Sequence, residues 1–117
     1  MNDRPSASVH HAKVAQNLLS MREHRSRYFG SEIFDEHAWT MLLHLFVEQS
    51  AHQKTSESRL YHLVDVSHVV GKRWLNHLVQ IHHVSVDDDE DEVTLTSTAL
   101  ERMTAFLESE ALSRIQD

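Results

Sequence analysis

The apolar residues of this chain recur with two different periods, and the order of these periods limits the folds open to it. From Val9 to about His82 they recur every three or four positions, which is the period of a helix with one buried face. In Val84–Val86 and again in Val93–Leu95 they alternate with polar residues, as in a strand. The helical period returns after Thr98. The sequence therefore predicts a mainly α-helical protein with one small β-hairpin.

Two helices are predicted in the first half of the chain. The first covers Val9–Arg27 and follows a disordered start, Met1–Ser8. The second runs from Asp35, a suitable N-cap, to Ser50. Its expected buried face consists of Ala38, Trp39, Leu42, Leu43, Phe46 and Val47.

Two shorter helices follow, and a tight turn at Asp65–Val66 joins them. The first, Glu57–Val64, begins after a threonine or serine cap. The second runs from His68 to about His82, with Ser67 as its cap. Two short helices joined by a tight turn and followed by a β-ribbon form a winged helix-turn-helix arrangement. A last helix, capped by a threonine, follows the hairpin.

The composition agrees with one helical domain in the cytoplasm. The chain has 117 residues, the size of one domain, and its two glycines and one proline are too few for a many-turned β fold. It has no cysteine, so a disulfide, a thiolate metal site and a cysteine nucleophile are excluded. No apolar run approaches the roughly 20 residues that span a bilayer, and the N-terminus lacks a signal-peptide core. We expect a winged helix-turn-helix domain over residues 9–117, with no membrane partner.

The net charge of -7 is concentrated in the last third of the chain. Up to His83 there are nine basic and eight acidic residues, a balance of +1, and from Val84 there are two basic and ten acidic ones, a balance of -8. Six acidic residues are consecutive in the loop of the predicted hairpin: Asp87, Asp88, Asp89, Glu90, Asp91 and Glu92. The wing of the predicted domain is therefore acidic.

Three segments carry residue patterns found together in one known family. Arg25–Phe46 has a basic-aromatic stretch followed by Trp-x-x-Leu-Leu-x-Leu-Phe, Ser67–Leu78 contains an Arg-Trp pair, and Val93–Thr96 leads into a Leu-Thr cap. In these segments the chain resembles the MarR-like winged-helix regulators, in particular a compact alphaproteobacterial type. The resemblance spans roughly residues 25–106 and implies a homodimeric transcription regulator that binds palindromic double-stranded DNA. The family has a glycine in place of His83 and an arginine-rich wing.

The second helix of a helix-turn-helix enters the major groove with its N-terminal part. Arg and Lys can read guanine or hold phosphate, and Ser and Thr can anchor phosphate. The plain alternative is that the basic residues are solvated surface charges. The candidate DNA contacts are Ser67, His68, Lys72 and Arg73, together with Thr55, Ser56 and Arg59 on the preceding helix.

The acidic loop conflicts with a wing that approaches phosphates, because like charges repel. Three alternatives remain open for it: a solvated loop that points away from DNA, a docking surface for a basic protein, and a cation-binding loop. It lacks the glycine and ordered spacing of a calcium hand. The alternative function is a winged-helix protein-interaction module whose DNA binding is weakened or lost.

The terminal helices carry apolar residues that a minimal winged-helix core does not need. We expect them to pair two copies of the chain. The expected dimer interface comprises Val14, Leu18 and Met21 of the first helix and Phe106, Leu107 and Leu112 of the last.

No residue pattern indicates catalysis, a metal or a cofactor. The sequence has no nucleophile elbow, phosphate loop or paired-carboxylate motif. Eleven histidines are present, but adjacent pairs such as His82 and His83 point to different sides of a helix, and no His-Glu-x-x-His motif occurs. We expect a protein that is not an enzyme and holds neither metal nor cofactor.

Overall fold

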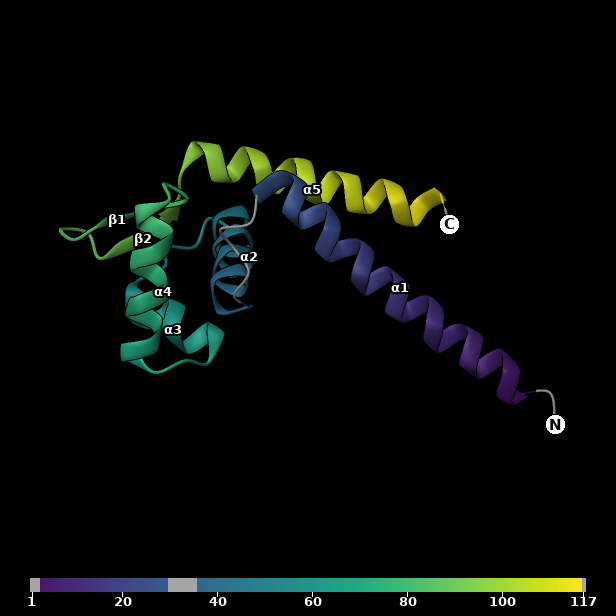
Figure 1. Cartoon of the computed structure of the whole chain (residues 1–117). Coiled ribbons are helices and arrows are strands. Elements are labelled where there is room, and N and C mark those ends of the chain that lie inside the picture. The colour runs from purple at the N-terminus through teal and green to yellow at the C-terminus, as the bar shows by residue number, and fades with distance from the viewer. Residues whose placement is uncertain (1–2, 30–35, 117) are drawn as a thin grey trace.

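The order of the elements matches the order expected from the two periods. The structure, a computed structural model, describes residues 3–29 and 36–116, with the side chains of residues 11–29 and 36–111. In these ranges the elements are α1 (Asp3–Phe29), α2 (Glu36–Ser50), α3 (Glu57–Val64), α4 (His68–Gln80), β1 (Val84–Asp87), β2 (Glu92–Leu95) and α5 (Ser97–Gln116). Figure 1 shows α3, α4 and the hairpin at one end, with α1 and α5 extending toward the other. The predicted winged helix-turn-helix class is confirmed.

Side-chain caps define where three of these helices start. The hydroxyl oxygens of Ser56, Ser67 and Thr96 each accept the backbone N–H three residues later, over 3.1, 3.2 and 3.2 Å. Each cap satisfies a donor that the first turn of a helix leaves unpaired. Ser67 is the cap that the sequence predicts for α4. Of the threonine and serine expected before α3 the serine, Ser56, is the cap, and Thr96 is the threonine that caps α5. Asp65, with a left-handed φ of 56°, ends α3 and makes the predicted turn.

The bounds of two helices differ from the expectation. α1 begins at Asp3, so it takes in most of the segment expected to be disordered. Pro5 falls in its first turn, where a missing N–H costs no hydrogen bond. α4 ends at Gln80, because His82 has a left-handed φ of 64° through which a helix does not continue. The expected cap of α2, Asp35, lies outside the described residues.

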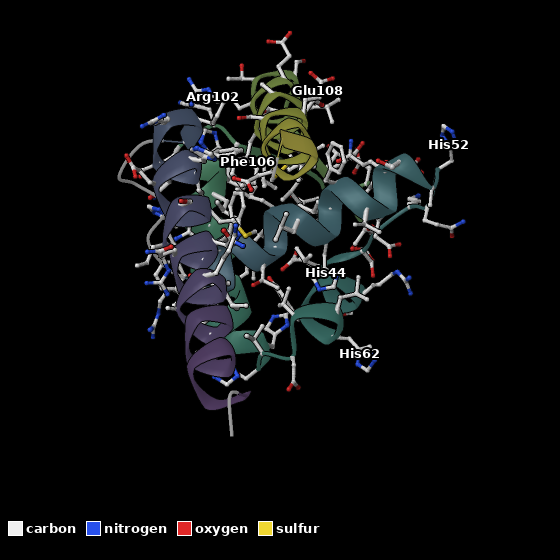
Figure 2. The ribbon with its side chains drawn as sticks, turned by 90° about the vertical axis from the view of Figure 1, so that its right-hand side faces the viewer. His44, His52, His62, Arg102, Phe106 and Glu108 are labelled. Atoms are coloured by element: carbon white, nitrogen blue, oxygen red, sulfur yellow. The ribbon has the colours of Figure 1, made fainter. Side chains whose placement is uncertain are left out.

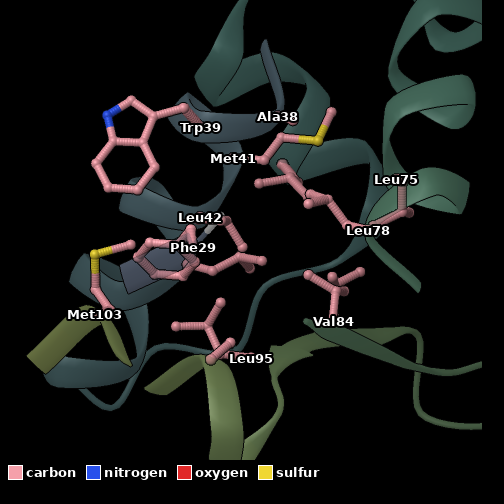
Figure 3. Packing of buried hydrophobic residues seen from close by; sticks show 14 of the residues in the cluster. Phe29, Ala38, Trp39, Met41, Leu42, Leu75, Leu78, Val84, Leu95 and Met103 are labelled. Carbon is pink, nitrogen blue, oxygen red and sulfur yellow. The ribbon is translucent and has the colours of Figure 1, made fainter. Parts of the chain in front are cut away.

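The hydrophobic core is built around α2. Met41, Leu42 and Leu45 on this helix are fully buried, and side chains from every other element of the domain pack around them (Figure 3). Phe29 from the end of α1 meets Trp39 edge to face, and Trp39 meets Phe106 of α5 in the same way. These ring pairs attach both terminal helices to the core.

The buried face of α2 differs from the expected one. Val47 was expected inside and is 60% exposed, whereas Met41, Leu45 and Glu48 are buried. The buried face of α2 is rotated around the helix axis relative to the expected one. The reason is that α3, α4 and β2 all pack against this helix. Which flank of a helix is covered by neighbours depends on tertiary packing and not on its own period.

The hairpin is fixed to the helices at its root. Its strands pair antiparallel, with Val84 opposite Leu95. The N–H of Val93 donates to the carbonyl oxygen of Thr55 over 2.8 Å, and the N–H of Leu95 donates to the side-chain oxygen of Gln49 over 2.6 Å. Val84, Val93 and Leu95 face the core. The root of the wing is therefore held in place, and its acidic loop projects outward.

α3 and α4 approach each other closely at Gly71. A Cβ at this position would lie 2.7 Å from Cε1 and 2.8 Å from Cγ of the Tyr61 ring, which real Cβ atoms essentially never do. Ring atoms of a buried side chain have little room to move. The angle of the helix-turn-helix therefore depends on a residue without a side chain at Gly71.

We expect Gly71→Ala to destabilise the domain by about 1–3 kcal/mol through overpacking against Tyr61. Urea unfolding followed by circular dichroism measures this loss. In a Tyr61→Ala background the same change should be neutral or stabilising, since alanine is worth up to about 1 kcal/mol over glycine in a helix. An equal cost of Gly71→Ala in both backgrounds would contradict the steric explanation.

Candidate nucleic-acid interface

α4 presents one clear solvent face. Gly71, Leu75 and Leu78 are buried on its inner side. The opposite side is exposed and carries Val69, Lys72, Arg73, Asn76 and Gln80. Among the described helices, α4 alone has no Asp or Glu, in a chain that contains 18 of them. This face is therefore neutral to basic within an acidic protein.

Lys72 is held by a carboxylate of the preceding helix. Its Nζ lies 3.0 Å from Oε1 of Glu57, and the Tyr61 hydroxyl donates to the same oxygen over 2.7 Å. These contacts, the Tyr61 hydrogen bond first, hold the pKa of Glu57 below its usual range. Burial and the same carboxylate raise the pKa of Tyr61. Glu57 is therefore ionised at neutral pH and neutralises Lys72.

Arg59 is held in a similar way by a buried carboxylate of α2. Its Nε and Nη2 donate to the two carboxylate oxygens of Glu48 over 3.2 and 3.1 Å. Such a two-point contact fixes the plane of the guanidinium. Arg59 itself stays exposed, so it retains donors that face solvent.

The other expected DNA contacts have different surroundings. Arg73 is exposed and has no carboxylate partner among the described side chains. The His68 ring rests edge-on against Tyr61, with 5.3 Å between ring centroids. Ser56 and Ser67 serve as helix caps.

Thr55 is 2% exposed, so the expectation that its hydroxyl reaches a phosphate is wrong. The start of α3 is covered by β2, which bonds to the Thr55 carbonyl.

The acidic wing is ordered by its own first residue and by one lysine. One carboxylate oxygen of Asp87 accepts the N–H groups of Asp89 and Glu90 over 3.1 and 3.2 Å. Lys54 lies 3.1 Å from the Glu90 carboxylate, and this hydrogen bond raises the pKa of Lys54. The remaining side chains of the loop tip, among them Asp88 and Asp91, are exposed. The wing therefore adds net negative charge beside the helix-turn-helix.

The terminal helices form an open apolar groove of about 900 Å³ between α1, α2 and α5. Glu110 of α5, which lines this groove, contacts His24 of α1, with 2.7 Å between Oε1 and Nδ1. Arg25 stacks 5.1 Å from the centre of the Trp39 ring. The apolar residues that line the groove are Ala15, Leu18, Leu19, Met21, Trp39, Leu43, Phe106, Leu107 and Ala111.

The residues expected at a dimer interface differ in how exposed they are in the structure. Val14 and Leu18 are exposed, and Met21 and Leu107 are half-buried. Phe106 is 3% exposed, because its ring fills the space beside Trp39 and Tyr28; Figure 2 shows it pointing inward from α5. The sequence placed it on an exposed surface, whereas it is a core residue of the single chain that also lines the groove. The side chain of Leu112 lies outside the described residues.

The described side chains include no group of three or more His, Asp or Glu that could hold a metal ion. His44 lies on α2, His52 in the turn after it and His62 on α3 (Figure 2). Within the described part of the chain, no helix is both long and apolar enough to cross a membrane.

No family model matches the sequence, and no curated protein is significantly similar to it. The structure, however, is similar to solved structures of MepR from S. aureus. MepR bound to ethidium bromide superposes with a TM-score of 0.64 at 11% identity, over 93% of this chain and 80% of MepR. A selenomethionine mutant of MepR from a multidrug-resistant clinical isolate gives 0.63 at 11% identity, over 93% and 81%. MepR is a MarR-family winged-helix regulator. This chain has the same winged-helix fold.

In this winged helix-turn-helix fold, α4 is the second helix of the helix-turn-helix and the hairpin is the wing. Sequence reasoning missed Glu48 and Glu57, the carboxylates that hold Arg59 and Lys72, and it did not pair Glu90 of the wing with Lys54. A signal existed for Glu48, which follows Met41 and Leu45 at helical spacing and so falls on a buried stripe. No sequence signal pairs Glu57 with Lys72, because they lie on different helices.

Proposed function

We propose that this chain is a DNA-binding transcription regulator that acts as a homodimer on a palindromic site, with α4 in the major groove. The observation that carries the proposal is the exposed face of α4, which has Arg73 unpaired among the described side chains and no acidic residue. The fold supports it, since winged-helix domains place this helix in DNA. The function proposed is binding, without catalysis.

Binding has to overcome the overall charge of the protein. A chain with a net charge of -7 is repelled by the phosphate backbone at long range. At short range Arg73 can contact DNA at once, whereas Lys72 first has to leave or share Glu57. An exposed ion pair of this kind is worth about 0–1 kcal/mol, so phosphates can compete for the lysine.

Arg73→Ala should weaken DNA binding by about 1–3 kcal/mol. It removes a guanidinium that no carboxylate holds and that is therefore available to contact a base or a phosphate. Lys72→Ala should cost less, because Glu57 already offsets its charge. Glu57→Gln should tighten binding at low salt by releasing Lys72. The DNA is first selected from random duplexes with the purified protein, and affinities are then measured by fluorescence anisotropy at fixed salt.

Arg102→Ala is the matched control, because it removes the same charge from an exposed position on α5, outside the helix-turn-helix (Figure 2). Its affinity should stay close to that of the wild type. Selection that enriches no palindrome, or an Arg73→Ala variant that binds as well as Arg102→Ala, would contradict the proposal.

The homodimer is supported by apolar surface that the single chain leaves uncovered. Val14, Leu18 and Leu19 of α1 are 44%, 60% and 64% exposed. α1 stands away from the body, and the radius of gyration of 16.9 Å exceeds the roughly 13 Å of a compact 100-residue domain. A second copy laid against the groove between α1 and α5 would cover Leu18 and Leu19, which line it, and could extend to Val14 one turn earlier on α1.

Light scattering should therefore give about twice the chain mass of 13.6 kDa at micromolar concentration. Leu18→Glu should shift the protein to monomer, because it places a charge in the proposed interface. Val47→Glu is a matched control, since Val47 is also 60% exposed but does not line the groove. A monomer mass for the wild type, or dissociation by both variants alike, would exclude this interface.

A second candidate function is docking of a basic protein partner at the wing, with DNA binding weakened. The exposed carboxylates at the tip of the hairpin favour it. This candidate and the first differ in what the wing charge does to DNA affinity.

Asp88→Asn together with Asp89→Asn should tighten DNA binding several-fold at low salt if the wing lies near DNA, and the gain should shrink as the salt concentration rises. Glu101→Gln with Glu108→Gln removes the same charge from exposed positions on α5 and should have little effect. If the wing variant matches this control in DNA affinity but loses a basic partner in a pull-down, the second candidate is the correct one.

A further inference from the structure

Val69 is the most exposed large apolar side chain among the described residues, at 71%. It is the second residue of α4. A β-branched residue on the surface of a helix adds no packing and lowers helix propensity. One exposed valine is common on protein surfaces and needs no function by itself. What distinguishes Val69 is its position relative to the other exposed residues of α4.

Val69, Arg73 and Asn76 form one stripe along the helix. At about 100° per residue, Arg73 and Asn76 lie within about 40° of Val69 around the axis. The buried residues Gly71 and Leu78 lie on the opposite side. From Val69 to Asn76 the helix rises about 10 Å, which corresponds to about three base pairs.

The chemistry of this stripe matches the edges of bases in the major groove. An apolar side chain suits the C5-methyl group of thymine, an arginine pairs with guanine, and an asparagine pairs with adenine. Lys72, on the flank of the stripe, is held by Glu57 and is suited to a phosphate. A basic to neutral helix with no carboxylate complements DNA, and a single valine is too small an anchor for a protein interface.

We infer that Val69 determines specificity by contacting the methyl group of a thymine in the half-site that α4 reads. This inference rests on the proposed DNA-binding function and adds a named base contact to it. The contact buries one methyl group on each side and forms no hydrogen bond. It therefore distinguishes thymine from uracil, which differs only by that methyl group.

The test uses the duplex selected by the wild-type protein, with each thymine of the half-site replaced in turn by deoxyuridine, symmetrically in both halves. At one position the replacement should weaken wild-type binding by about fourfold per half-site, the effect expected for one buried methyl group. Val69→Ala should weaken binding to the thymine duplex by a similar factor. The Val69→Ala protein should also bind equally well to the two duplexes that carry thymine or uracil at that position.

Val79→Ala is the matched control, because Val79 is also exposed on α4 but lies in its last turn. It should keep the wild-type response to uracil. The inference is overturned if no thymine position responds in the wild type, or if Val69→Ala still discriminates at the position that does. A protein that selects no DNA sequence at all would overturn the proposed function itself, and this contact with it.

Discussion

The burial of α2 holds the rest of the structure in place. α3, α4 and β2 all contact this helix, and Trp39 on it receives the rings of Phe29 and Phe106 from the terminal helices. A buried leucine side chain is worth about 1.5–3 kcal/mol, so a helix with several of them dominates the stability of a small domain. α2 also carries Glu48, the buried carboxylate that orients Arg59. One helix thus organises both the core and part of the surface proposed to meet DNA.

The charges on this surface are arranged so that most cations already have a partner. Lys54, Arg59 and Lys72 are each paired with a carboxylate from a different element, whereas Arg73 has none among the described side chains. Exposed ion pairs contribute little to stability, but they favour the side-chain conformation in which the two charges are in contact. Residues that look equivalent in the sequence, such as Lys72 and Arg73, are therefore unequal in what they can offer a nucleic acid.

The two ends of the molecule are connected through aromatic contacts. α1 and α5 meet near Tyr28 and Phe106, and the Trp39 ring joins them to the helix that supports the helix-turn-helix. Pairing of two copies through the terminal helices would fix the distance between their α4 helices. That distance decides which spacing of half-sites a dimer can read.

Much of the fold follows from local signals in the sequence. The two hydrophobic periods predict the element order, Ser67 predicts the start of α4, and the switch at Val84 predicts the wing, because period and caps act over a few neighbouring residues. The sequence also determines the acidity of the wing. Tertiary structure alone decided that Phe106 is core, that Thr55 is covered by β2, and that Glu57 neutralises Lys72. These outcomes depend on which elements lie against each other, and residues distant in sequence become neighbours only through that packing.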